Sequence, residues 1–105
     1  MKTFFMLLAM TGMFLATMNV SAAPATANHP IVKEIVGYML DKPTNMEEKI
    51  AAAVDRFKVE NGKPSYEKAN KYIAKMLVHF AYDKGPAGVS RREYLTDTVI
   101  AYLRF

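Results

Sequence analysis

Cysteine and tryptophan are absent from this 105-residue sequence, and histidine occurs only twice. The lack of cysteine excludes disulfide scaffolds, thiolate metal sites, cysteine nucleophiles and thiol-linked lipid anchors. The two histidines, His29 and His79, belong to different predicted segments and lack the close spacing typical of a zinc site. We therefore expect neither a metal nor another cofactor.

Glycine and proline are scarce, with five residues of each. The richest cluster, residues 85–88, carries Pro86 where a phosphate-binding loop needs an amide donor. This cluster predicts a break between helices, or a recognition loop. The sequence also has no recognisable nucleic-acid-binding motif, so we expect no nucleic acid partner.

The first 22 residues have the three-part layout of a secretory signal peptide. Lys2 supplies the positive start, an apolar run follows over residues 4–16, and small residues occupy positions 20–22. The apolar run is short for a membrane span, which needs about 20 residues. We predict cleavage after Ala22 and export to the periplasm or the cell exterior. An uncleaved signal-anchor and a cleavage point a few residues further on are the alternatives.

Removing these residues leaves 83 residues with 13 basic and 10 acidic side chains, a net charge of +3. A chain of this length can form at most one small domain. Residues 23–29 show no periodicity and predict a flexible N-terminal tail, followed by a single helical domain over residues 30–105. So small a domain has a low free energy of unfolding. Association into a homodimer is therefore an alternative to a monomer.

Four segments of the predicted domain show helical spacing of apolar residues. The first begins near His29 and Pro30 and ends at residues 41–43, with Gly37 weakening it by about 1 kcal/mol unless close packing requires it. The apolar residues of this segment form a broad face. They are Ile31, Val32, Ile35, Val36, Met39 and Leu40.

The second segment begins at a predicted capping box, Thr44 to Glu47, and ends at Asn61 and Gly62. A hairpin at Asn61 and Gly62 is discounted, because Pro64 would interrupt its second strand. The predicted inward residues are Met46, Ile50, Ala53, Val54 and Phe57, and the predicted outward residues are Glu48, Lys49, Asp55, Arg56 and Lys58.

The third segment begins at Ser65 and runs to about Lys84, and the fourth begins at a second capping box, Ser90 to Glu93. Short connections between the four segments favour antiparallel neighbours. The sequence thus predicts an all-α fold, a small up-down bundle of about four helices. The inward residues expected are Ala69, Ile73, Met76, Leu77 and Phe80 in the third segment, and Leu95, Val99, Tyr102 and Leu103 in the fourth.

Catalytic groupings are hard to find in the sequence. His79 is followed one turn later by Asp83, which could orient a general base, but no nucleophile accompanies them. A surface histidine with a local ion pair is the simpler interpretation. The remaining carboxylates alternate with basic residues, as on a solvated helix face. We therefore expect no enzymatic activity.

The third segment carries a row of basic and aromatic residues opposite its apolar face, formed by Lys68, Lys71, Lys75, His79 and Tyr82. Such a row suits an acidic partner or an anionic membrane surface. An ordinary solvated helix face is the simpler interpretation, since Glu67 and Asp83 flank the row.

The predicted mature chain has six tyrosines, more than a small core can hold, so several lie at the surface. Tyrosine favours protein contacts because its ring is apolar and its tip is polar. We expect contact with an unidentified protein partner through Tyr66, Tyr72 and Tyr82 together with Gly85, Pro86 and Gly88. The hypothesis is an exported binding protein, such as an inhibitor, immunity factor, escort or assembly accessory. The alternative is a cationic protein that contacts anionic membranes or envelope polymers.

Overall fold

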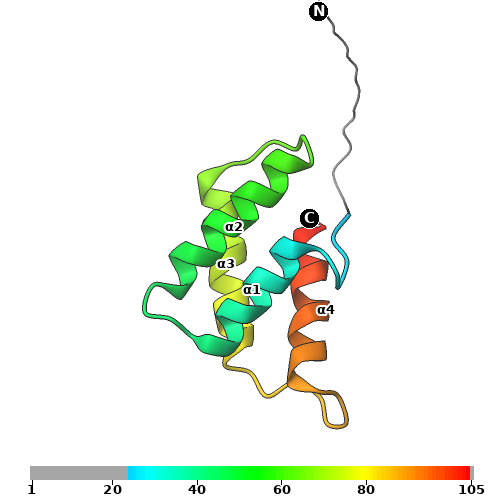
Figure 1. The fold of residues 1–105 in the computed structure, drawn as a ribbon. Coiled ribbons are helices and arrows are strands. Elements are labelled where there is room, and N and C mark those ends of the chain that lie inside the picture. Colours follow the sequence, from blue (N-terminus) through cyan, green and yellow to red (C-terminus); the bar gives the residue numbers. More distant parts are fainter. Residues whose placement is uncertain (1–23, 105) are drawn as a thin grey trace, which may run out of the picture.

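The computed structural model describes residues 24–104, which form four α-helices and, within that range, no strand (Figure 1). The all-α prediction with four helices is therefore confirmed for this part of the chain. The predicted signal peptide, residues 1–22, lies outside the described residues. The helices are α1 (Pro30–Asp41), α2 (Met46–Glu60), α3 (Glu67–Ala81) and α4 (Arg91–Leu103).

Helices α1 and α3 each contact the other three helices. Helices α2 and α3 form the most extensive pair, and α4 packs against α1 and α3. Successive helices alternate in direction in Figure 1. The broad apolar face of α1 is buried in these contacts, since Val32, Ile35 and Met39 have no exposed surface.

The start of α1 is fixed by His29, near which the sequence predicted this helix to begin. Its Nδ1 accepts a hydrogen bond of 3.0 Å from the backbone N–H of Ile31. The imidazole is 5 % exposed and meets the ring of Phe57 edge-on, with 5.1 Å between ring centroids. The histidine therefore ties the first turn of α1 to α2.

The segment before α1 also packs on the helices. Ala25 is buried among the core residues, and the backbone N–H of His29 donates to the carbonyl of Thr26 at 3.0 Å. Part of the predicted N-terminal tail thus lies against the folded body.

Two capping boxes were predicted. In the one at Ser90, the cap side chain accepts its hydrogen bond; in the one at Thr44, it does not. Ser90 Oγ accepts from the backbone N–H of Glu93 at 3.1 Å and caps α4. Before α2, however, Asn45 is the cap residue, and no side chain caps the helix. The prediction that Thr44 caps this helix was wrong, because Thr44 lies one residue before the actual cap position.

Helix α3 is shorter than predicted, and its buried face is rotated. It begins after Tyr66 rather than at Ser65 and ends at Ala81 rather than near Lys84. Two of the expected inward residues, Ile73 and Leu77, are buried, whereas Ala69 is exposed and Met76 and Phe80 are only partly buried. The buried residues of α3 are Asn70, Ile73, Ala74, Leu77 and Ala81.

This rotation has a packing cause. The buried positions follow the spacing of one continuous helical stripe, and three of them are small or polar residues, which allow neighbouring helices to approach closely. On α2 the predicted inward residues are all buried, but Lys58 joins them with 9 % exposure. Its predicted place on the outward face was wrong, because it lies one turn after Val54 on the same side of the helix.

No helix within residues 24–104 has the length and apolar character that crossing a membrane requires.

Candidate functional site

The basic row predicted on the third segment lies on α3, on the side away from the core. Five residues follow one another at alternate steps of four and three positions, a spacing that aligns them along one side of a helix. They are Lys68, Tyr72, Lys75, His79 and Tyr82. Lys71 lies beside this row. We call these six residues the α3 outer face, and all six are exposed.

The three tyrosines named from the sequence are among the most exposed large side chains of the described residues. Tyr66, Tyr72 and Tyr82 are 67 %, 64 % and 67 % exposed. Tyr66 immediately precedes α3, and Tyr82 immediately follows it. The ammonium group of Lys42 lies 5.3 Å from the centroid of the Tyr82 ring, a cation–π contact that steadies this end of the face.

The lysines of the α3 outer face differ in their surroundings. Lys71 forms an ion pair of 3.0 Å with Glu67, and the hydrogen bond to that carboxylate raises the pKa of Lys71. Lys68 and Lys75 form no ion pair within the described residues. These two lysines therefore carry most of the uncompensated charge of the face.

The predicted pairing of His79 with Asp83 does not occur. The Asp83 carboxylate instead accepts a hydrogen bond of 2.7 Å from the hydroxyl of Tyr94, and this bond raises the pKa of Tyr94. The His79 ring lies edge-on to its neighbour Phe80, with 5.8 Å between ring centroids. Among the described residues, no carboxylate pairs with His79 to orient it as a base.

The loop that contains Gly85, Pro86 and Gly88 is held to α4 by specific contacts. Arg91 donates to the backbone carbonyls of Ala81 and Asp83, which closes the end of α3. Gly85 has a φ of +77°, and a Cβ built on it would lie 2.7 Å from Tyr94 Cδ2. Pro86 and Gly88 are exposed. Gly85 therefore has a structural role, while the loop tip stays accessible.

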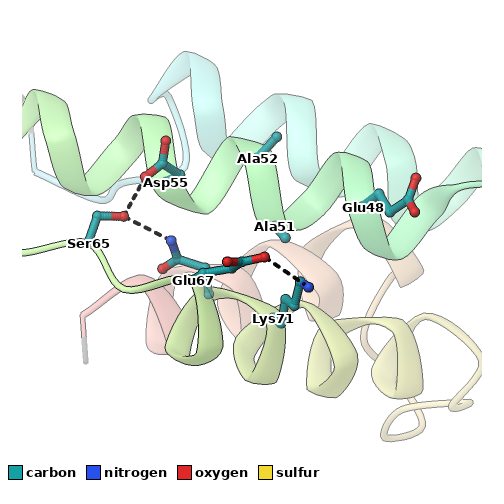
Figure 2. Close-up of a pocket in the computed structure, with 8 residues that line it drawn as sticks. Glu48, Ala51, Ala52, Asp55, Ser65, Glu67 and Lys71 are labelled. Atoms are coloured by element: carbon teal, nitrogen blue, oxygen red, sulfur yellow. Dashed lines mark hydrogen bonds and ion pairs between the residues drawn. The ribbon is translucent and has the colours of Figure 1, made fainter.

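A polar groove runs between α2 and α3 and borders the α3 outer face at Lys71. Figure 2 shows Ser65 linking the two sides of the groove, because its hydroxyl donates to Asp55 and accepts from the side-chain amide of Asn70 at 2.8 Å. The groove encloses about 380 Å³. Its lining residues are Glu48, Ala51, Ala52, Asp55, Ser65, Glu67, Asn70 and Lys71.

The polar groove contains one unsatisfied atom. Asn70 is 5 % exposed, and its carbonyl oxygen has no hydrogen-bond partner among the described residues. Within the same residues, no group of three or more histidine, aspartate or glutamate side chains has a geometry that could hold a metal ion. The acidic residues of this groove thus do not converge on a common point.

A second groove, here called the apolar groove, lies where α2, α3 and α4 meet and encloses about 580 Å³. It shares Lys68 and Tyr72 with the α3 outer face. Lys58 and Ala69 also line it, and both were missed as site residues from the sequence. The helical spacing of Lys58 after Val54 could have placed it on the buried side. The full lining is Lys58, Lys68, Ala69, Tyr72, Ile73 and Tyr102.

Comparison with protein-family models, with curated proteins and with solved structures finds no match to this chain.

Proposed function

We propose that this protein acts by binding another protein through the α3 outer face, without catalysis. The observation that carries the proposal is the coincidence, on one side of one helix, of exposed tyrosines and of lysines that form no ion pair within residues 24–104. Tyr72 and Tyr82 offer large apolar rings with polar tips, and Lys68 and Lys75 offer charge for an acidic counterpart. Tyrosine anchors of this kind dominate the energetics of many protein interfaces.

The proposal includes export of the protein to the periplasm or the cell exterior. This part rests on the sequence of residues 1–22, with its positive start, apolar run and small residues before Ala22. An inhibitor, an immunity factor, an escort and an assembly accessory are the roles that such an exported binding protein would fill. The up-down helical bundle, with short connections, would serve as a rigid support for the binding helix.

Co-purification from the native compartment tests the proposal. The protein is expressed from its full sequence with a C-terminal tag and recovered at low and at high salt. We expect one stoichiometric protein that survives the high-salt wash, because tyrosine contacts persist when charge contacts are screened. Alanine at Tyr72 and Tyr82 should remove that protein, whereas Val59→Ala, an exposed apolar truncation on α2, should retain it.

Other outcomes would contradict the proposal. Recovery of lipid or acidic polymer that salt releases would favour a cationic surface-binding protein. Recovery of a second copy of this chain alone would indicate a self-associating protein. Retention of the captured protein by the Tyr72→Ala/Tyr82→Ala variant would show that the contact lies elsewhere.

A further inference from the structure

Lys58 is buried to an unusual degree for a lysine. It is 9 % exposed, and it lies on α2 where residues of α3 and α4 line a groove with it. Within residues 24–104 its ammonium group makes no hydrogen bond or ion pair. A buried lysine without a partner is costly unless its charged end reaches water or an anion. Lys58 is one of the residues that line the apolar groove, so this groove is open to its side chain.

The other residues of the apolar groove give it a definite chemical character. Ala69 and Ile73 form an apolar floor, and the rings of Tyr72 and Tyr102 contribute further apolar surface. Lys68 adds a second positive charge, and none of the described residues that line the groove is acidic. The polar groove on the other side of α3 differs in charge, since it contains three carboxylates beside a single lysine.

We infer that the apolar groove binds a single-chain amphiphile that has an apolar tail and an anionic head group. The tail lies on Ala69 and Ile73 between the two tyrosine rings, and the head group pairs with the ammonium groups of Lys58 and Lys68. A volume of about 580 Å³ is within the range of small-molecule sites. The charge of the two lysines, with no opposing carboxylate among the lining residues of the range 24–104, selects an anion over a cation.

This inference goes beyond the proposed function, although Lys68 and Tyr72 belong to both surfaces. Its test uses the purified protein alone, expressed from the full sequence, so that no protein partner is involved. Dodecanoate is titrated below the concentration at which it forms micelles, and binding is followed by isothermal titration calorimetry. Dodecyltrimethylammonium, which has the same tail and the opposite charge, is titrated in parallel.

We expect saturable binding of one dodecanoate per chain, at least about tenfold tighter than binding of the cationic amphiphile. Lys58→Met keeps the stem and removes the charge, and it should weaken dodecanoate binding about tenfold. Ala69→Glu places bulk and negative charge in the groove and should weaken binding further. Lys33→Met, at an exposed position of α1, removes the same charge and should leave the affinity unchanged.

Three results would overturn the inference: equal affinity for the two amphiphiles, no saturable binding below micelle formation, or an unchanged affinity in Lys58→Met. Because Lys58 is buried, thermal unfolding followed by circular dichroism checks that the variant folds. If it does not, Lys68→Met at an exposed position tests the same charge requirement. A negative result leaves the proposed protein contact standing, since Lys75 and Tyr82 do not line this groove.

Discussion

Gly85 has the most demanding position in the loop between α3 and α4. Its φ is +77°, and an added Cβ would lie 2.7 Å from the Tyr94 ring, whereas Gly88 has a φ of +82° with no atom within 4 Å of such a Cβ. We expect Gly85→Ala to lower the free energy of unfolding by about 2–3 kcal/mol and Gly88→Ala by about 1 kcal/mol. Urea denaturation of both variants measures the difference, and equal losses would contradict the proposed contact with Tyr94.

Glu34 joins α1 to α2 through hydrogen bonds. Both of its carboxylate oxygens accept from Arg56, and Tyr38 donates to one of them at 2.7 Å. The Arg56 hydrogen bond holds the pKa of Glu34 below its ordinary value of 4.5. A lowered pKa means that the folded state favours the ionised form. The stabilisation is therefore present above pH 4.5 and is lost as the pH falls through the lowered pKa.

Replacing this carboxylate should reveal the same pH dependence. We expect Glu34→Gln to lower the free energy of unfolding by about 0.5–1 kcal/mol at neutral pH, a modest value because the Arg56 side chain is 48 % exposed. The difference between the variant and the parent should vanish at acid pH, well below 4.5. Urea denaturation at the two pH values measures it, and a difference that does not change with pH would contradict the assignment.

Gly37 tests whether α1 needs close packing at its one glycine. A Cβ added to Gly37 would meet no atom within 4 Å, and the residue lies inside a regular helix. Alanine favours a helix over glycine by about 1 kcal/mol. Gly37→Ala should therefore raise the free energy of unfolding by up to about 1 kcal/mol, as measured by thermal unfolding. A loss of stability would show that α1 has a closer neighbour at this point.

The two helix starts with predicted capping boxes provide a matched pair. Ser90 caps α4 through its hydroxyl, whereas no side chain caps α2. We expect Ser90→Ala to lower the free energy of unfolding by about 1 kcal/mol and Thr44→Ala to change it by less than about 0.5 kcal/mol. Chemical denaturation of both variants compares them. Similar losses at the two positions would mean that Thr44 also stabilises the start of its helix.

At the level of whole helices, local sequence patterns predicted most of what the structure contains. The start of α1 near His29, the Ser90 cap and most of the apolar positions of α1, α2 and α4 follow from short-range spacing, although the predicted inward residues Leu40 and Tyr102 are only partly buried. The register of α3 did not follow from hydrophobicity, because the helix buries Asn70 and Ala81 where it approaches its neighbours closely and leaves Phe80 partly exposed. Packing against α2 decided the register, and the sequence pattern gives no direct measure of it.

For the molecule as a whole, the sequence predicted the exposed tyrosines and lysines of the α3 outer face but neither of the grooves beside it. Each groove is formed by residues from two or three helices, so its shape depends on tertiary packing rather than on local spacing. The partner of Asp83 and the surroundings of Lys58 likewise depend on other helices, since Asp83 bonds to Tyr94 of α4 and Lys58 shares a groove with residues of α3 and α4. Surface chemistry on one helix was therefore predictable, whereas cavities and long-range pairings were not.

The claim that the α3 outer face binds another protein is tested most directly by measuring the affinity of the captured protein for two variants that carry the same change in charge. Lys75→Glu/Tyr82→Ala changes only the α3 outer face, whereas Lys33→Glu/Val59→Ala makes the same change in charge and a similar apolar truncation elsewhere. Loss of an interface tyrosine, and of a lysine that pairs with an acidic group of the partner protein, should weaken binding by at least about 2 kcal/mol, or about thirtyfold. We predict this weakening in the first variant and unchanged affinity in the second. Equal affinities of the two variants would contradict the assignment of the α3 outer face as the binding surface.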